Sequence, residues 1–294
     1  MKSVLLAAPA KINLFLDITA RRDDGYHEIL SIMQSVSLCD EVFLQQIDGQ
    51  GIVLECDNPA IPTGRDNIAY KAAELFMKNA SLNCGLKISL RKSIPAAAGL
   101  AGGSTDAAAV LRGLNNMFGK PFSTDGLCRM AESLGADVPF CVRGGCMKAE
   151  GIGNVLTDLG SLPACHIVIT CPDERVSTPA AYGALDKMYD NFKQRACNDV
   201  IYYRAEAALM NGDIEAICKH TYNIFEDVQN GREDIKRIKQ LMLEAGAEAS
   251  MMSGSGPSVF GIFKSAEAAS LAAMLLEQRG YTAYSCSPTG KNKI

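Results

Sequence analysis

A run of glycine and alanine at residues 95–105, PAAAGLAGGST, is the feature that most constrains how this 294-residue chain can fold. Residues 86–90 alternate apolar and polar side chains, which predicts a strand. Residues 107–118 place their apolar side chains on one helical face, and Gly119 and Pro121 follow as helix stop signals. The run is therefore predicted to be a loop of small residues between a strand and a helix.

A loop of this composition can bind phosphate. Small side chains let backbone N–H groups approach an anion, and the N-terminus of the following helix adds unpaired donors and partial positive charge. We predict a nucleotide phosphate site made of Pro95, Ala96, Ala97, Ala98, Gly99, Leu100, Ala101, Gly102, Gly103, Ser104 and Thr105. Ser104 and Thr105 are also expected to cap the helix and to touch a phosphate or its Mg²⁺. The alternative is a flexible turn before a helix N-cap, and the loop is not a Walker A motif.

Two charged residues lie in segments whose neighbouring side chains are mostly small or apolar and are predicted to be buried. Lys11 lies in a predicted strand, with Asn13 two positions later. It is either a lysine at a sheet edge or a cation beside a reacting alcohol or phosphate. Asp137 lies in GADVPF, after a predicted helix over residues 126–134. It is either a turn residue before a proline or a carboxylate that accepts a hydroxyl proton.

Two further segments combine glycine with polar residues. Residues 253–258, SGSGPS, lie between two predicted strands. They are either a hairpin turn or a second set of backbone donors at the site. Residues 22–27, RDDGYH, predict a turn followed by an aromatic and imidazole pair.

Composition argues against several kinds of function. The net charge is -4 and no basic run is present, so neither nucleic acid nor an anionic membrane is an expected partner. The eleven cysteines include no C-x-x-C pair, which favours buried thiols in a reducing compartment over a zinc site. The apolar stretch near the N-terminus is short, and no run approaches the ~20 residues of a membrane span. We expect a cytoplasmic protein without a signal or transit peptide.

The pattern along the chain predicts an α+β protein of two domains. Residues 1–160 are rich in predicted strands and contain the glycine-alanine loop. Residues 161–294 follow a change in pattern at residues 160–163. Helices in this second part are predicted at residues 180–189, 199–211, 233–245 and 266–279, with strands at 166–170, 249–253, 258–263 and 281–286.

Taken together, AKINL, DGYH, the glycine-alanine loop, GADVPF and SGSGPS resemble the motifs of the GHMP kinases, in the family's order and over almost the whole chain. The resemblance implies a two-domain GHMP kinase fold, with a ribosomal protein S5 domain 2-like N-terminal domain and a ferredoxin-like C-terminal domain. The spacing is similar to that of members that phosphorylate the 2-hydroxyl of a CDP-linked methylerythritol in isoprenoid biosynthesis. ATP, with Mg²⁺, is the phosphoryl donor that the resemblance implies.

The resemblance also implies roles for individual residues. Lys11 and Asp137 would act on the substrate hydroxyl, residues 95–105 would hold the ATP phosphates, and Asn67 would lie near the nucleotide base. The residues expected to bind the CDP-linked alcohol are Asn13, Tyr26, His27 and Tyr182.

Two positions depart from the family pattern. Asp23 replaces the proline that usually precedes DGYH, and Ala101 stands where glycine is usual in the phosphate loop. Neither change removes a reacting group. Two alternatives stay open: another GHMP kinase, acting on homoserine or mevalonate, or a nucleotide sensor without catalytic activity on the same fold.

Overall fold

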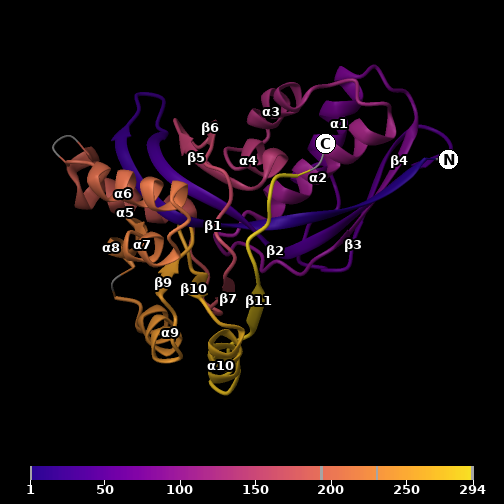
Figure 1. Ribbon diagram of the computed structural model, residues 1–294. Helices are drawn as coiled ribbons and strands as arrows, with labels where there is room; N and C mark the ends of the chain where they lie inside the picture. Colours follow the sequence, from indigo (N-terminus) through magenta and orange to yellow (C-terminus); the bar gives the residue numbers. More distant parts are fainter. Residues whose placement is uncertain (1, 193–194, 230, 293–294) are drawn as a thin grey trace.

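The computed structural model of the chain describes residues 2–192, 195–229 and 231–292. Its strands form two sheets (Figure 1). The strands are β1 (Ser3–Arg21), β2 (His27–Ile47), β3 (Gly51–Cys56), β4 (Gly85–Arg91), β5 (Cys146–Glu150), β6 (Val155–Asp158), β7 (His166–Thr170), β8 (Tyr222–Asn223), β9 (Ala249–Met252), β10 (Val259–Phe263) and β11 (Ala283–Cys286). The helices are α1 (Ile68–Asn79), α2 (Gly102–Met117), α3 (Thr124–Glu132), α4 (Val138–Arg143), α5 (Thr178–Met188), α6 (Asp199–Met210), α7 (Ile214–Lys219), α8 (Phe225–Val228), α9 (Glu233–Glu244) and α10 (Ala266–Glu277), with a 3₁₀ helix at Asp190–Phe192.

The larger sheet is built on a long antiparallel hairpin of β1 and β2. Its main strand order is β3-β4-β2-β1-β8, and β5 and β6 attach through β2. The hairpin register runs from Ser3 opposite Gln45 to Arg21 opposite His27, so its tip is the turn at residues 22–26. Figure 1 shows this hairpin crossing from the side of α1 to α4 to the side of α5 and α6. A single pair of strands thus reaches both halves of the molecule.

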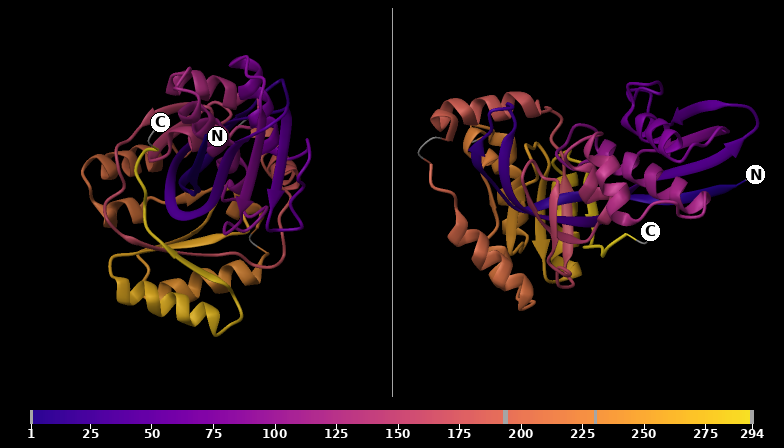
Figure 2. Two further views of the ribbon diagram at one scale, coloured as in Figure 1. Left: turned by 90° about the vertical axis from the view of Figure 1, so that its right-hand side faces the viewer. Right: turned by 90° about the horizontal axis from the view of Figure 1, so that it is seen from above.

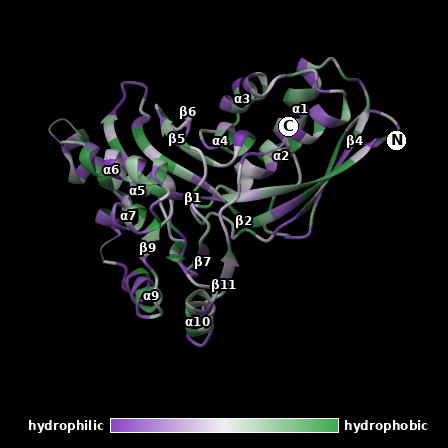
Figure 3. Cartoon of the chain, viewed as in Figure 1, coloured by the Kyte–Doolittle hydropathy of each residue, from purple (hydrophilic) through white to green (hydrophobic). Residues whose placement is uncertain are grey.

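The smaller sheet has the antiparallel order β11-β7-β10-β9. Helices α9 and α10 lie together along one side of this sheet (Figure 2). Both helices carry hydrophobic and hydrophilic residues (Figure 3), and the apolar side chains of Ile238, Met242 and Leu276 are buried. This half confirms the ferredoxin-like arrangement expected from the sequence.

Two cores hold the sheets and helices together. One core joins the large sheet to α1 and α2 through residues such as Leu44, Phe76 and Val110. The other lies between the two sheets and includes Ile12 and Ile167. Burying apolar side chains of this size contributes roughly 1.5–3 kcal/mol each. The cores therefore fix the position of β1, which forms part of the site described below.

The second half of the chain returns to the large sheet twice. Strand β8 pairs in parallel with β1, with Phe15 opposite Tyr222. After β11, the backbone N–H of Thr289 donates to Ser35 O at 2.9 Å. The α+β class is confirmed, whereas the domain boundary at residue 160 stays a prediction. Among the described residues, no helix is both long and apolar enough to cross a membrane.

Candidate active site

Both halves of the chain line a cavity of about 760 Å³. The first half contributes β1, the glycine-alanine loop and the start of α2, and the second half contributes α5 and residues 254–255. The predicted site residues that line it are Lys11, Asn13, Tyr26, His27, Ala97, Ala98, Gly99, Ala101, Gly102, Gly103, Ser104, Asp137 and Tyr182. The fold thus brings together segments that lie far apart in the sequence.

Lys11 and Asp137 form the charged centre of the cavity. The β1–β2 register shifts between Pro9 and Lys11, and such a bulge redirects nearby side chains. Lys11 Nζ donates to Asn13 Oδ1 at 2.7 Å and lies 3.9 Å from Asp137 Oδ2. The Lys11 side chain is 5% exposed and that of Asp137 is 34% exposed. The ammonium group is therefore buried and held in place, which argues against an exposed lysine at a sheet edge, while the carboxylate can reach a ligand.

Asn13 is oriented by a short chain of hydrogen bonds. Its Nδ2 donates to Ser31 Oγ at 2.9 Å, and that hydroxyl donates to Phe15 O at 2.6 Å. Because the Asn13 amide donates to serine, its oxygen faces Lys11. The expected polar companion of Lys11 is therefore present, while direct contact of Asn13 with a substrate stays a prediction.

Helix α2 begins inside the glycine-alanine loop. Its N-cap is Ala101, in the left-handed region at φ 59°, and no side chain caps the helix. The expected capping by Ser104 and Thr105 is therefore wrong, because the helix starts two residues before Ser104. The N–H groups of Gly102, Gly103 and Ser104 have no acceptor within the helix. Since these three residues line the cavity, the first turn of α2 can bind an anion.

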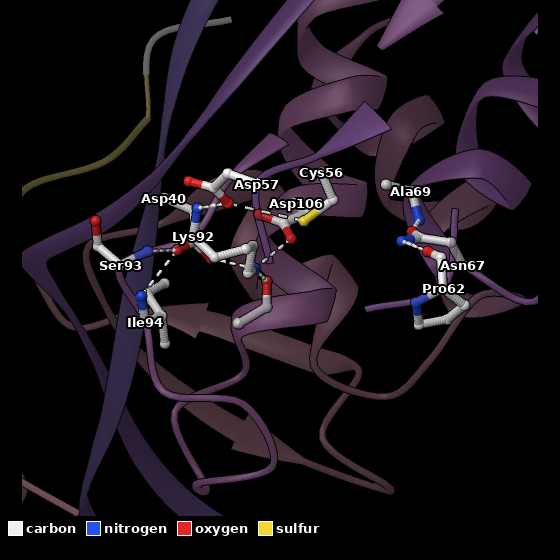
Figure 4. A network of polar contacts seen from close by, with 11 residues as sticks. Asp40, Cys56, Asp57, Pro62, Asn67, Ala69, Lys92, Ser93, Ile94 and Asp106 are labelled. Carbon is white, nitrogen blue, oxygen red and sulfur yellow. Dashed lines mark hydrogen bonds and ion pairs between the residues drawn. The ribbon is translucent and has the colours of Figure 1, made fainter. Parts of the chain in front are cut away.

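A buried lysine joins the two ends of this loop (Figure 4). Lys92 Nζ contacts the carboxylates of Asp40, on β2, and Asp106, in the first turns of α2. Asp40 Oδ1 also accepts from the backbone N–H groups of Ser93 and Ile94 at 2.6 and 2.8 Å. We call Lys92, Asp40 and Asp106 the loop clamp, because they tie the start of the loop to the helix that follows it.

The loop clamp contains one more negative charge than positive charge when both carboxyl groups are ionised. Burial, opposed in part by Lys92 and reinforced by Asp40, raises the pKa of Asp106 to about 7. Burial lowers the pKa of Lys92, but the carboxylates of Asp106 and Asp40 outweigh it and the net shift is upward. Lys92 therefore stays charged, and Asp106 gains a proton near neutral pH.

The SGSGPS segment packs directly on the phosphate loop. Ser253 Oγ donates to Gly99 O at 3.1 Å, and the N–H of Ser258 donates to Ala98 O at 3.3 Å. A Cβ atom added to Gly99, whose φ is +77°, would lie 2.2 Å from Ser253 O. Gly254 lines the cavity. The segment is thus more than a hairpin turn, because it forms one wall of the cavity and supports the loop.

Aromatic side chains line the end of the cavity nearest the hairpin tip. Tyr26 is 59% exposed, so it is not part of a core. His27 stacks on Tyr182, with ring centroids 4.7 Å apart and planes at 30°. Burial raises the pKa of Tyr182 to about 12. His27 Nε2 lies 2.7 Å from Asp186 Oδ1. Tyr26 is free to contact a flat ring, whereas one face of Tyr182 is already covered by His27.

Five predicted residues do not line the cavity: Pro95, Ala96, Leu100, Thr105 and Asn67. Thr105 is fully buried. Leu100 O accepts from the N–H of Lys11 at 3.1 Å, which ties the loop to β1. Asn67 caps α1: its Oδ1 accepts from Ala69 N at 2.8 Å, and its Nδ2 donates to Pro62 O at 2.7 Å (Figure 4). The nucleotide-binding roles expected for these five residues stay predictions.

Neither the loop clamp nor Asp186 was predicted from the sequence. Asp106 follows the loop in an alanine-rich helix, and a charge on the buried side of such a helix requires a partner. That signal was available: the partner is Lys92, 14 positions earlier, whereas the second carboxylate of the loop clamp, Asp40, lies 66 positions earlier. Asp186 is four residues after Tyr182 on α5, so helical geometry places both on one face.

Comparisons with known proteins agree with this arrangement. The model of the GHMP kinases N terminal domain matches residues 67–145, and that of the GHMP kinases C terminal matches residues 205–281. The chain is 45% identical to a 4-diphosphocytidyl-2-C-methyl-D-erythritol kinase of Caldicellulosiruptor saccharolyticus, over 88% of each chain. It is 43% identical to the protein of that name in Acetivibrio thermocellus, over 92% of this chain and 94% of the relative.

Solved structures show the same fold. A crystal structure of 4-(cytidine 5'-diphospho)-2C-methyl-D-erythritol kinase superposes with a TM-score of 0.81 at 32% identity, over 98% of this chain and all of the other. A homoserine kinase from Cytophaga hutchinsonii gives a TM-score of 0.76 at 21% identity, over 100% of this chain and 96% of the other, which shows likeness of fold alone. The chain therefore belongs to the GHMP kinase superfamily and, within it, to the 4-diphosphocytidyl-2-C-methyl-D-erythritol kinase family.

Proposed function

We propose that this chain transfers the γ-phosphoryl group of ATP to the 2-hydroxyl of 4-diphosphocytidyl-2-C-methyl-D-erythritol, in the non-mevalonate pathway of isoprenoid biosynthesis. The observation that carries the proposal is the Lys11–Asp137 pair, 3.9 Å apart, in the same cavity as the open N-terminus of α2. A charge pair for the acceptor and a helix N-terminus for the donor are the parts that phosphoryl transfer to an alcohol requires. The names of the relatives support this acceptor.

Asp137 and Lys11 would act on the acceptor hydroxyl. Asp137, the more exposed of the two side chains, would orient the hydroxyl and accept its proton. Lys11 would stabilise the negative charge that develops on the attacking oxygen. Phosphoryl transfer has a loose transition state, so holding the hydroxyl in line with the γ-phosphate contributes more than proton removal.

The residues present fit a magnesium ion bound with ATP. Mg²⁺ prefers oxygen ligands, and the Asp137 carboxylate and the Ser104 hydroxyl line the same cavity. These two residues would hold the ion together with phosphate oxygens. When bound, Mg²⁺ would neutralise phosphate charge.

The aromatic end of the cavity would bind the cytidine group. Tyr26 and Tyr182 would contact the faces of the base, and His27 would bind its edge. The exposure of Tyr26 and its place in the cavity lining support this role. Asn67 would lie near the adenine, and Asn13 near the alcohol.

We also propose a cytoplasmic protein that acts on a small molecule, without nucleic acid or membrane as a partner, which agrees with the net charge of -4.

A substrate panel tests the proposal. ATP consumption would be measured with the CDP-linked alcohol, the same alcohol without the CMP group, homoserine and mevalonate. Turnover is expected only with the CDP-linked alcohol, because only it can use the aromatic end of the cavity. Turnover of homoserine or mevalonate would favour another GHMP kinase, and ATP binding without turnover of any alcohol would favour a nucleotide sensor.

A further inference from the structure

His27 is held from several sides in a single orientation. Its Nε2 lies 2.7 Å from Asp186 Oδ1, and one face of the imidazole stacks on Tyr182. The ring of Phe192 packs against it in a T-shaped arrangement, with ring centroids 5.9 Å apart. The His27 side chain is 7% exposed and that of Asp186 is 17% exposed. Both residues line the cavity. The imidazole cannot easily rotate to exchange one ring nitrogen for the other.

The contact with Asp186 determines which nitrogen carries the proton. An ionised carboxylate only accepts hydrogen bonds, so Nε2 must be the donor. In the neutral ring, Nδ1 then has a free lone pair and can only accept. Among the described residues, no hydrogen-bond partner of Nδ1 is found. His27 therefore presents an unused acceptor to a ligand in the cavity.

We propose that Asp186 is a positioning residue that holds His27 as the Nε2–H tautomer, and so selects a pyrimidine with an amino group at position 4. This inference rests on the proposed function, because it concerns the cytidine end of the same cavity. Cytosine carries an amino donor at position 4, where uracil carries an oxygen acceptor. Nδ1 accepts from the amino group of cytosine, whereas it repels the corresponding oxygen of uracil. Tyr26 and Tyr182 contact either base equally, so the choice between them depends on His27.

The two oxygens of Asp186 have different partners, which provides a matched control. Oδ1 accepts from His27, and Oδ2 lies 3.5 Å from Arg21 Nε. Arg21→Gln changes the surroundings of the carboxylate but leaves the His27 contact. Asp186→Leu removes the acceptor for Nε2–H. Asp186→Asn restores it, because the amide oxygen can accept from the same N–H.

Nitrogen-15 NMR tests the tautomer directly. The chain has three histidines, and His27→Gln identifies the signals of His27. We expect Nε2 to be protonated and Nδ1 to be unprotonated in the wild-type protein, and a mixture of tautomers in Asp186→Leu. A protonated Nδ1 in the wild-type protein, as the other tautomer or as imidazolium, would overturn the proposal.

Base selectivity tests the consequence. The ratio of kcat/KM for the CDP-linked alcohol to that for its UDP analogue would be measured in each variant. Asp186→Leu should lower this ratio by roughly ten- to a hundredfold, the effect of one unpaired buried polar group. The change should appear in the KM of the pyrimidine substrate and not in the KM of ATP. Asp186→Asn and Arg21→Gln should stay close to the wild-type ratio.

Binding of CMP and UMP by calorimetry separates this proposal from the proposed function. Absence of turnover with the CDP-linked alcohol would refute the proposed function, while a preference for CMP that Asp186→Leu abolishes would still support the role of Asp186. If turnover is normal and Asp186→Leu keeps the full selectivity, the role of Asp186 is refuted alone. If Asp186→Leu does not fold, Asp186→Asn provides the test instead. A variant Asp186→Asn that keeps the wild-type tautomer of His27 but loses the selectivity for cytosine would also refute the role of Asp186.

Discussion

At the scale of single residues, the charged groups of the site lie close to one another, and all but Asp137 are buried. Lys11 faces Asp137 across 3.9 Å, and Lys92 contacts two carboxylates in the loop clamp. Removing one partner from a buried pair leaves an uncompensated charge, which is strongly destabilising. Substitutions that keep shape while changing charge are therefore the most informative.

Asp137→Asn tests the role of the more exposed partner of Lys11. The amide keeps the shape of the side chain but cannot accept the hydroxyl proton. We expect kcat to fall by ~10²–10⁴-fold, the usual effect of losing a general base, with little change in ATP affinity. Steady-state kinetics and calorimetry with ATP measure the two effects. Asp125→Asn is the control, because Asp125 forms an exposed ion pair with Arg143 on the surface. A normal kcat in Asp137→Asn would show that Asp137 is not the residue that accepts the hydroxyl proton.

Asp106→Asn tests the excess charge of the loop clamp through the pH dependence of stability. The pKa of Asp106 is about 7 when folded against an ordinary value of 3.8, so between these pH values the folded state binds the extra proton. The free energy of unfolding therefore falls as pH rises toward 7. From pH 5.5 to 8.5 this group should lower it by about 2 kcal/mol. Denaturant unfolding at both pH values should show this loss in the wild-type protein and not in the variant. Parallel pH profiles would show that Asp106 does not titrate in this range.

How far the sequence predicts such residues depends on where their partners lie. Lys11 and Asp137 each interrupt a local pattern, so the sequence identified both, although it left a structural alternative open for each. Asp40 and Lys92 are 52 positions apart, and no local pattern relates them. Pairs that only the tertiary fold brings together are not visible in one sequence.

At the scale of elements, regular periodicity was predicted better than its interruptions. The strand predicted to contain Lys11 and Asn13 is part of β1, which spans Ser3–Arg21. Its register shifts between Asn13 and Phe15. Ile12 therefore faces the core between the two sheets, whereas Leu16 belongs to the other large core. Strict alternation would have placed both on one face. The sequence could not predict the difference, because a bulge of one residue has no characteristic composition.

Short or irregularly patterned elements were also missed. Helix α4 is six residues long, which is too short for helical periodicity to be recognised. Most of β2 was missed because residues 28–36, EILSIMQSV, do not alternate strictly. In contrast, the strand expected at residues 166–170 agrees with β7, and the four helices expected after residue 163 match α5, α6, α9 and α10 closely.

Gly99→Ala tests the contact between the two loops. A methyl group there would lie 2.2 Å from Ser253 O at a φ of +77°, so one loop must move. We expect ATP affinity to fall by at least tenfold while the CDP-linked alcohol still binds. Gly119→Ala is the matched control, since Gly119 has a similar φ of +82° and nothing within 4 Å. It introduces the same backbone strain without the collision. Calorimetry with each ligand distinguishes them, and equal ATP affinity in both variants would contradict the packing described for Gly99.

At the scale of the whole molecule, the two sheets are joined beside the cavity by Asn223. This residue lies on β8, opposite Leu16 of the large sheet. Its Nδ2 donates to Met252 O at 2.7 Å and to Gly254 O at 2.8 Å, and its Oδ1 accepts from Phe225 N at 3.0 Å. One buried amide thus connects β1 to the SGSGPS segment. The sequence predicted the two halves and their order, but not this parallel pairing, because two-residue strands have no pattern of their own.

Asn223→Leu should weaken the connection between the halves. It leaves two buried carbonyl groups and one N–H without their partner, and each such group costs ~1–3 kcal/mol. We expect the free energy of unfolding to fall by at least ~3 kcal/mol, and KM for ATP to rise because Gly254 and the phosphate loop lose support. Asn79→Leu is the control, since Asn79 makes one exposed hydrogen bond to Leu75 O. Equal stability of the two variants would contradict the role of Asn223.

Phosphorus-31 NMR of the wild-type reaction tests the central claim most directly. The protein would be mixed with ATP, Mg²⁺ and 4-diphosphocytidyl-2-C-methyl-D-erythritol. Carbon 2 of this alcohol bears a methyl group and no hydrogen, so a phosphate on its oxygen has no proton three bonds away. We predict one new phosphomonoester signal without proton coupling, which grows in step with ADP. A signal split by neighbouring protons would place the phosphate on another hydroxyl, and ATP that remains intact would contradict the assignment of this chain as a kinase for that alcohol.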